Sequence, residues 1–270
     1  MSVVVAVANN KGGVGKTTTS LNLANILKSK GFKVLLIDLD GQSNATNQCG
    51  IEVVDGMPTV YDLLTVHGAD IVETIQPTDH YGDLVPADVL LVNAAERMAM
   101  LDNREYMLVD AIAPVRDAYD YIVMDCPPTL DIVVKNAFIA ADTVIIPMVH
   151  DGYGLRGFDK VMAQVEAVRG NPRLNPSLTV SGILVTQFAD RTRIGSSFSA
   201  QLPKVAEGYG VRVFETPIRK SIKVSEASVV GLPLAMHAPL SKPAHDYGWF
   251  VDEFIVETLG ASSLDHPSAS

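Results

Sequence analysis

A glycine-rich loop between an apolar segment and a helical pattern constrains this chain more than any other feature. The loop, Asn9 to Thr18, reads NNKGGVGKTT, and it lies between the apolar run Val3–Ala8 and a helical pattern over Thr17–Lys30. Glycines let such a backbone curl until successive N–H groups face one anion, and the helix N-terminus adds partial positive charge. Lys16 then reaches the phosphates of a nucleotide, and the Thr17 hydroxyl binds Mg²⁺. The alternative, a turn without a ligand, leaves two lysines that repel each other.

Apolar strands alternate with helical patterns along the rest of the chain. We predict strands at Val3–Ala8, Val34–Ile37, Tyr121–Met124, Thr143–Pro147, Val180–Thr186 and Val211–Glu215. We predict helices at Thr17–Lys30, Asn103–Arg116, Ile132–Ala140, Leu155–Arg169, Ser196–Tyr209 and Tyr247–Leu259. This order predicts an α/β fold with a mostly parallel sheet and helices on both faces, which binds ligands at the carboxyl ends of its strands. We expect one domain over 1–260 and a frayed tail over 261–270.

Composition places the chain among folded globular proteins. Hydrophobic residues make up 47% and charged residues 19%, which argues against disorder. The formal charge of −10 speaks against a general nucleic-acid coat protein. The two cysteines, Cys49 and Cys126, form no metal-binding spacing and fit a reducing cytosol. We see no signal peptide and no run long enough to span a membrane, so we expect a cytoplasmic protein.

Two further strands end in acidic residues. The run from Leu35 leads into Asp38-Leu39-Asp40, and Tyr121–Met124 is followed by Asp125-Cys126-Pro127-Pro128. A carboxylate at the tip of a strand, such as Asp125, can hold Mg²⁺ through its water shell. Simple capping of the strand end is the alternative, and for Asp38 the two interpretations stay open. Cys126 is expected to be a small core residue.

These motifs resemble those of the ParA/MinD ATPases, whose P-loop is a deviant Walker A sequence. The resemblance rests on Lys11 to Thr18, with Asn10 where general P-loops have glycine, and on the segment Asp40 to Thr46. It implies a P-loop NTPase that binds ATP and Mg²⁺ and hydrolyses ATP. Asp40 would orient or deprotonate the attacking water, and Gly41 to Thr46 would form the first switch. Gly41 replaces the usual proline, which should loosen the turn.

The resemblance also implies how the site residues divide the work. It implies an ATP-dependent homodimer in which Lys11 of one subunit reaches the nucleotide of the other. The catalytic residues would be Lys11, Lys16 and Asp40, and the metal would be held by Thr17 and by Asp125 through water. The nucleotide would contact Lys11, Gly12, Gly13, Val14, Gly15, Lys16, Thr17, Thr18, Gln187, Phe188 and Pro217. The last three are placed on the adenine by the resemblance alone.

Three functions compete within this resemblance. The first is a partition ATPase that binds DNA without sequence preference and is released when a ParB-like activator stimulates hydrolysis. The second is a membrane-bound ATPase like MinD, which needs a basic amphipathic C-terminal helix. The segment Tyr247–Thr258 has no Lys or Arg, so we expect no membrane binding and read this helix as packing on the domain. The third is a nitrogenase-iron-protein-like reductase, for which Cys49 and Cys126 are the only candidate cluster ligands.

A basic segment favours the DNA-binding function. From Phe188 to Lys223, seven Lys or Arg stand against three acids, a local charge of +4 in an acidic chain. The candidate DNA contacts, which would be insensitive to sequence and sensitive to salt, are Arg191, Arg219, Lys220 and Lys223. An ordinary solvated surface is the alternative. The cargo stays open between chromosome, plasmid and a protein assembly.

Overall fold

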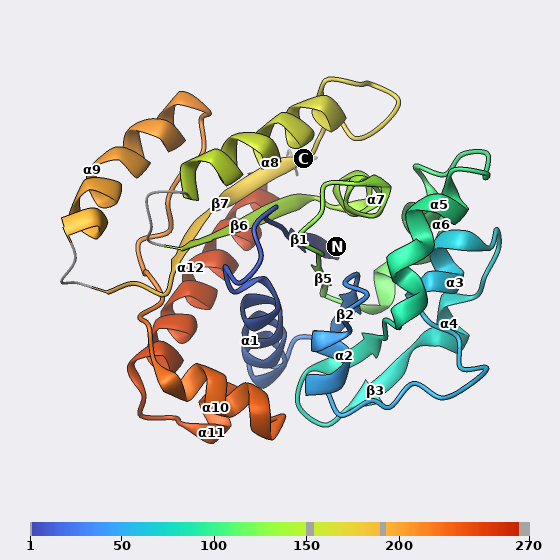
Figure 1. Ribbon diagram of the computed structural model, residues 1–270, viewed down its shortest axis with the longest axis horizontal. Coiled ribbons are helices and arrows are strands. Elements are labelled where there is room, and N and C mark those ends of the chain that lie inside the picture. Colours follow the sequence, from blue (N-terminus) through green and yellow to red (C-terminus); the bar gives the residue numbers. More distant parts are fainter. Residues whose placement is uncertain (1, 150–153, 190–192, 265–270) are drawn as a thin grey trace, which may run out of the picture.

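The computed structural model describes residues 2–149, 154–189 and 193–264. Its centre is a seven-stranded sheet in the order β3-β4-β2-β5-β1-β6-β7 (Figure 1). The strands are β1 (Val3–Val7), β2 (Val34–Asp38), β3 (Gln76–Thr78), β4 (Gly82–Val85), β5 (Tyr121–Asp125), β6 (Thr143–Val149) and β7 (Thr179–Thr186). Every pairing is parallel except that of β3 with β4 at one edge. The predicted α/β fold with a mostly parallel sheet is confirmed.

Helices cover both faces of this sheet (Figure 1). The α-helices are α1 (Lys16–Ser29), α2 (Asn44–Gln48), α3 (Val60–Thr65), α4 (Ile71–Thr74), α5 (Ala94–Met98), α6 (Met107–Ile112), α7 (Ile132–Ala140), α8 (Gly154–Arg169), α9 (Arg193–Gly208), α10 (Ile222–Val230), α11 (Leu234–His237) and α12 (Lys242–Leu264). Two short 3₁₀ helices are η1 (Val89–Asn93) and η2 (Arg116–Ala118). In the described part of the chain, no helix combines the length and the apolarity that a bilayer span requires.

Alternate residues of the strands divide the core into two layers. Val5 and Val7 of β1 pack with α1 and with the buried side of α12, which carries Tyr247, Phe250 and Phe254. Val4 and Ala6 point to the other face, where α3, α6, α7 and α8 supply the partners. Because successive side chains of a strand point to opposite faces, a strand apolar at every position needs a cover on each side. The prediction that the C-terminal helix packs on the domain is confirmed.

The strand predicted at Val211–Glu215 does not form. Only Val213 bridges Ile183, through Ile183 N–H to Arg212 C=O and Phe214 N–H to Ile183 C=O. The next carbonyl of β7 in this register, that of Val185, accepts from Ile218 N–H at 2.8 Å. In a regular parallel ladder it would accept from Thr216 N–H, two residues after Phe214, so the pairing stops after one bridge.

The helix predicted at Asn103–Arg116 is much shorter. Asn103 has a φ of 54°, a left-handed conformation that no α-helix interior contains. At the other end Pro114 lacks an N–H and cannot continue the helix. Only α6 remains, followed by the separate turn η2.

The C-terminal helix is longer than its sequence pattern predicts. It begins at Lys242 and continues to Leu264, so residues 261–264, which we expected to fray, are helical. Residues 265–270 lie outside the described part of the chain. The single domain over 1–260 stays a prediction.

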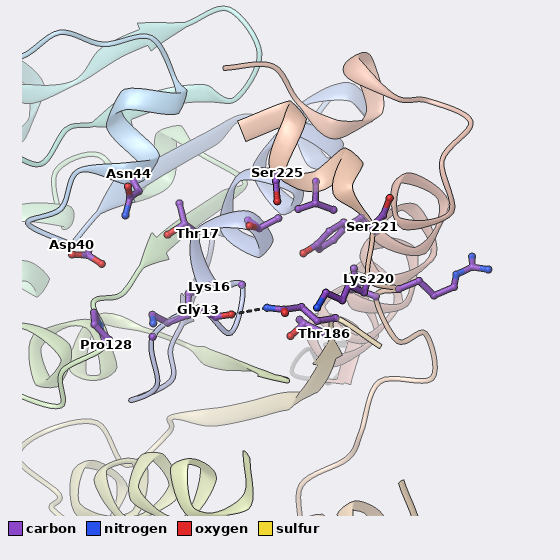
Figure 2. Close-up of a pocket in the computed structure, with 18 of the residues that line it drawn as sticks. Gly13, Lys16, Thr17, Asp40, Asn44, Pro128, Thr186, Lys220, Ser221 and Ser225 are labelled. Atoms are coloured by element: carbon purple, nitrogen blue, oxygen red, sulfur yellow. Dashed lines mark hydrogen bonds between the residues drawn. The ribbon is translucent and has the colours of Figure 1, made fainter. Parts of the chain in front are cut away.

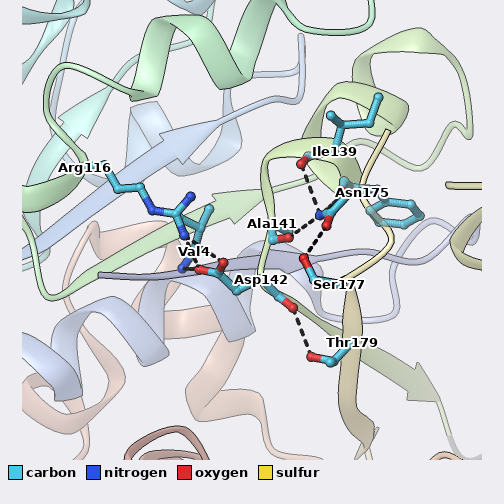
Figure 3. Close-up of polar contacts among 9 residues, drawn as sticks. Val4, Arg116, Ile139, Ala141, Asp142, Asn175, Ser177 and Thr179 are labelled. Atoms are coloured by element: carbon cyan, nitrogen blue, oxygen red, sulfur yellow. Dashed lines mark hydrogen bonds and ion pairs between the residues drawn. The ribbon is translucent and has the colours of Figure 1, made fainter. Parts of the chain in front are cut away.

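A polar cluster holds the amino ends of the central strands, at the opposite edge from the glycine-rich loop (Figure 3). The Asp142 carboxylate accepts a hydrogen bond from Val4 N–H at 2.8 Å. It also forms an ion pair with the Arg116 guanidinium at 2.7 Å. Asn175 donates from Nδ2 to the carbonyls of Phe138, Ile139 and Ala141 at 3.1, 3.1 and 2.7 Å. These carbonyls end α7, where no intrahelical donor remains. Asn175 therefore joins the end of α7 to the start of β7.

We expect Asn175→Ala to lower the free energy of unfolding by about 2–3 kcal/mol, because buried carbonyls lose their donor. Urea unfolding followed by circular dichroism measures the change. ATP affinity, measured by calorimetry, should stay unchanged, since the cluster lies far from the loop. Asn171→Ala is the matched control at an exposed asparagine, where we expect no comparable loss. Equal effects of the two variants would contradict the role of Asn175.

Candidate nucleotide-binding site

A cavity of about 510 Å³ opens at the carboxyl edge of the sheet. One side is the loop between β1 and α1, with Gly12, Gly13, Gly15, Lys16, Thr17 and Thr18. Asp40, Asn44 and Pro128 lie at one end of it, and Thr186, Lys220 and Ser221 lie at the other (Figure 2). The topology therefore brings the loop and the Asp40 turn to one cavity, as the sequence predicts.

Hydrogen bonds from outside the loop fix the orientation of its peptide groups. Gln187 Nε2 donates to Gly13 C=O at 2.6 Å, and Thr186 Oγ1 donates to Val14 C=O at 2.8 Å (Figure 2 marks the first). Within the loop, Lys16 Nζ donates to Lys11 C=O at 3.2 Å. In a planar trans peptide the C=O and the following N–H point in opposite directions. Each fixed carbonyl therefore turns the next amide away from it, and the loop is preorganised for an anion.

The start of α1 depends on a glycine. Gly15 is the N-cap of α1 and has a φ of 87°, a left-handed conformation that other residues adopt only with strain. A Cβ there would also lie 3.7 Å from Thr186 Cγ2. The loop therefore lies close to the carboxyl end of β7 at the residue where α1 begins.

Lys16 is a buried cation among buried acids. Its side chain is 7% exposed, and burial lowers its pKa, an effect opposed by the charges of Asp125, Cys126 and Asp40. A phosphate bound beside this ammonium group would supply a negative charge that stabilises the buried cation. Lys16 therefore has the surroundings expected of a phosphate ligand.

Asp38 and Asp125 are fully buried and adjacent across the β2–β5 pair. Burial raises the pKa of Asp125 to about 7, with Asp38 as the next cause, and burial raises the pKa of Asp38 to about 6. Ser20 donates to Asp125 Oδ1 at 2.9 Å, whereas buried Oδ2 has no hydrogen-bond partner among the described residues. The Thr17 side chain, which lines the cavity, is a neighbour of the Asp125 carboxylate, so the unpartnered oxygen fits a contact to Mg²⁺ through water.

The Asp40 turn is held by short polar contacts at the end of β2. Asp40 N–H donates to Asp38 Oδ1 at 3.1 Å, and Asp40 Oδ1 accepts from Gln42 N–H at 3.0 Å. Asp38 thus has a defined structural role, which its sequence context left open. Asp40 borders the cavity, and its place beside a nucleotide stays a prediction.

The far end of the cavity differs in part from the predicted adenine site. Gln187 lines it, whereas Phe188 and Pro217 do not, and Ile218 to Ser221 line it instead. Phe188 N–H donates to Ile218 C=O, and Lys220 N–H donates to Phe188 C=O, both at 2.9 Å. The Phe188 side chain packs against the core behind the sheet. The assignments of Phe188 and Pro217 are therefore corrected to the segment beside them.

Several lining residues carried no sequence signal. Tyr247 reaches the cavity from α12, and its hydroxyl lies 3.4 Å from Thr19 Oγ1. Ser225 comes from α10, a helix that we did not predict. Asn44 of α2 lies in the segment Gly41 to Thr46, which the resemblance implies as the first switch. Thr186 could also have been found, because it lies at the carboxyl end of a predicted strand.

The four candidate DNA contacts have different surroundings. Arg219 forms an ion pair with Asp246, which is only 2% exposed. This pairing occupies the Arg219 guanidinium, which argues against a direct contact between Arg219 and DNA. Lys223 pairs with Glu226 at 2.7 Å on the surface. Lys220 is exposed at the rim of the cavity. Arg191 lies outside the described residues.

Cys126 does not form a reactive site in this structure. It is 1% exposed within the core, and burial raises the pKa of its thiol, with a further rise from the Asp125 charge. Its predicted role as a small core residue is confirmed. Among the described residues, no group of three or more His, Cys, Asp or Glu is placed to hold a metal ion.

A parallel sheet whose first strand leads through a glycine-rich loop into α1, with buried acids beside the loop, defines the P-loop NTPase class. A family model described as AAA domain matches residues 2–180. The sporulation initiation inhibitor protein Soj of Bacillus subtilis is 37% identical over 248 residues, which cover 92% of this chain and 96% of Soj. The chromosome-partitioning ATPase Soj of Thermus thermophilus is 38% identical over 257 residues, covering 95% and 97%. The chain belongs to the ParA/Soj family of partitioning ATPases.

One similar solved structure contains bound ligands. Cobyrinic acid a,c-diamide synthase from Mycobacterium smegmatis, with bound ATP analog and magnesium, has a TM-score of 0.82 and 30% identity to this chain. The alignment covers 97% of both chains. The resemblance to ParA/MinD ATPases and the P-loop fold are therefore confirmed, and the chain is an ATPase.

The Asp38–Asp125 pair predicts a pH-dependent stability in the absence of nucleotide. Because both pKa values are raised, the folded protein keeps protons that an ordinary aspartate, with a pKa of 3.8, releases in the unfolded chain, so this contribution to stability falls as pH rises from about 4 to 7. Asp125→Asn removes one charge of the pair. From pH 5 to pH 8 we expect the variant to gain about 2 kcal/mol of unfolding free energy relative to the parent. Urea titrations at both pH values measure it, and parallel curves would show that the pair is not strained.

Proposed function

We propose that this chain is a partition or positioning ATPase that dimerises on ATP, binds DNA without sequence preference and leaves it when a ParB-like activator stimulates hydrolysis. The observation that carries the proposal is the preorganised loop with Lys11 and Lys16 beside the Asp40 turn. Its experiment is co-sedimentation with DNA and with liposomes, each with ADP and with a non-hydrolysable ATP analogue. Retention on DNA only with the analogue supports it, and retention on liposomes supports a membrane function.

ATP and Mg²⁺ are the proposed ligands of the cavity. The loop amides and buried Lys16 would hold the phosphates, and Thr17 with Asp125, the latter through water, would hold the metal. Bound Mg²⁺ would neutralise phosphate charge and the repulsion between Asp38 and Asp125. Asp40, at the cavity wall, would orient or deprotonate the water that attacks the terminal phosphate.

The proposed switch is the homodimer. Lys16 already occupies the phosphate end of its own subunit, and its ammonium contacts the Lys11 carbonyl. A second lysine side chain from the facing subunit, Lys11, would add a cation where negative charge spreads during phosphoryl transfer. Hydrolysis and phosphate release would remove the charge that holds the lysines together, and the dimer would separate.

The proposed DNA surface uses the basic segment near the cavity. Lys220 is exposed at the cavity rim, so a nucleotide-dependent dimer would place two copies of this segment near one interface. Lys223 would extend the candidate surface, and Arg219 would support it from behind by neutralising Asp246. Arg191, outside the described residues, is a candidate contact from the sequence alone. The protein would then act in the cytoplasm, on the nucleoid.

The described contacts of α12 favour DNA over a membrane. Tyr247, Phe250, Val251 and Phe254 of α12 are buried in the core, whereas Trp249, Val256 and Leu259 are exposed. The acids on its surface pair with the domain, Asp252 with Lys30, and Glu253 and Glu257 with Arg212. A membrane-binding helix needs basic residues opposite a free apolar face. The cargo, chromosome, plasmid or protein assembly, stays open.

We expect Asp40→Ala to bind ATP with near-parental affinity and to hydrolyse it about 100-fold more slowly, because the attacking water loses its orienting carboxylate. Calorimetry and phosphate release measure the two quantities, and sedimentation should show an ATP-bound dimer. Lys16→Ala is the reference variant and should lose nucleotide binding. Normal turnover by Asp40→Ala would remove this residue from the mechanism.

We expect Lys220→Glu and Arg191→Glu to lose ATP-dependent DNA retention while keeping ATP binding. Each lost phosphate contact should lower the salt slope of DNA binding by about 1 per subunit. Lys160→Glu, at an exposed lysine of α8, is the matched charge-reversal control and should retain DNA. If both test variants bind DNA like the control at low salt, the surface is misplaced.

A further inference from the structure

The turn that carries Asp40 is fastened to a segment on its far side, residues 86–93, which includes η1. This turn borders two cavities, because Gln42 lines both the nucleotide cavity and a second groove of about 920 Å³. Gly41, Ala87 and Val89 also line that groove. Two contacts join the turn to the segment, one on each side of Gln42.

The first contact is made by Thr46, in α2 behind the turn. Its side chain is buried, and its hydroxyl donates to Asp38 Oδ2 at 2.7 Å while accepting from Ala87 N–H at 2.9 Å. Thr46 N–H donates to the same carboxylate oxygen at 2.9 Å. The other oxygen of Asp38 holds the Asp40 amide at 3.1 Å. One carboxylate therefore joins the Asp40 amide to Thr46, and the Thr46 hydroxyl joins both to Ala87.

The second contact is the packing of Val92 on Gly41. A Cβ added to Gly41 would lie 2.8 Å from Val92 Cγ2 and 3.0 Å from Val92 N. Such distances are shorter than real side-chain contacts, so no larger residue fits without moving the turn or η1. Val92 therefore occupies the space that a side chain at position 41 would need.

The backbone of the Asp40 turn is strained at Ser43, so contacts from its surroundings are required to hold it. Ser43 has a φ of 52°, a left-handed conformation that is unfavourable for a residue with a side chain. Its amide donates to Asp40 C=O at 2.8 Å, which closes the turn. Strained conformations persist only where the surroundings determine them.

We propose that Thr46 and the Gly41–Val92 contact are positioning elements for hydrolysis, which hold Asp40 at the nucleotide by fixing its turn to residues 86–93. They act through Asp40 and touch no nucleotide. The proposal rests on the catalytic role proposed for Asp40. Since small displacements of a reacting group cost large factors in rate, disturbing either contact should lower kcat and leave ATP binding nearly unchanged.

The Gly41–Val92 contact is tested by a double-mutant cycle. We expect Gly41→Ala to lower kcat about 10-fold or more with the Kd for ATP within about twofold. Adding Val92→Ala to Gly41→Ala removes the atom nearest to the new Cβ and should restore at least about a third of the lost rate. Adding Val89→Ala instead, at an exposed residue of η1, is the control and should restore none of it. An unchanged kcat in Gly41→Ala would overturn the proposal, and so would equal effects of Val92→Ala and Val89→Ala on the Gly41→Ala variant.

The Thr46 contact is tested by two substitutions of similar size. Thr46→Ser keeps the hydroxyl and should retain kcat within about threefold, while Thr46→Val loses both hydrogen bonds and should lose about 10-fold or more. Circular dichroism and calorimetry with ATP check that each variant folds and binds. If Thr46→Val fails to fold, the Gly41 cycle alone decides the matter, because Gly41 and Val92 lie at the surface of the turn.

Asp40→Ala in the same assay separates this proposal from the proposed function. Slow hydrolysis by Asp40→Ala together with parental rates in Gly41→Ala and Thr46→Val would overturn only the positioning role. Parental hydrolysis by Asp40→Ala would instead overturn the catalytic assignment on which the positioning role rests.

Discussion

Burial of opposite charges at one edge of the sheet is the constraint on which the rest of the site depends. Lys16 is 7% exposed, and Asp38 and Asp125 are fully buried on neighbouring strands. Two acids beside one cation leave an uncompensated negative charge in a region of low dielectric. The surrounding hydroxyls of Ser20 and Thr46 reduce this cost without removing it. A divalent cation accompanied by a polyphosphate would balance both signs of charge at once.

The sequence predicts the parts of this site that are contiguous along the chain. The loop between β1 and α1 combines local geometry with ligand contacts in ten neighbouring residues, so its motif is readable without a structure. Strands β2 and β5 are predicted well for a related reason, because each is a short apolar run that ends in an aspartate. Between residues 50 and 100 the elements are three to six residues long and carry no sustained periodicity, so β4, α3 and α5 were not predicted.

Contacts between distant segments account for the predictions that failed. The sequence gives Arg219 as one of several surface cations, yet Asp246, in the first turns of α12, neutralises it. The strand predicted at Val211–Glu215 stops after one bridge because the next carbonyl of β7, that of Val185, accepts from Ile218 N–H. Gly41 also has a distant contact, because Val92, from a segment without a sequence pattern, lies against it. In each case the partner is many residues away and carries no motif of its own.

The fixed carbonyls of the loop have a consequence for the kinetics of nucleotide entry. Because Gln187, Thr186 and Lys16 already hold the peptide groups of residues 11–14, little backbone freedom is left to lose when a ligand arrives. Encounter should then proceed at a rate set by diffusion and by the field of the lysines, with no slow folding step before it. Differences in residence time between a diphosphate and a triphosphate would arise almost entirely in the rate of departure.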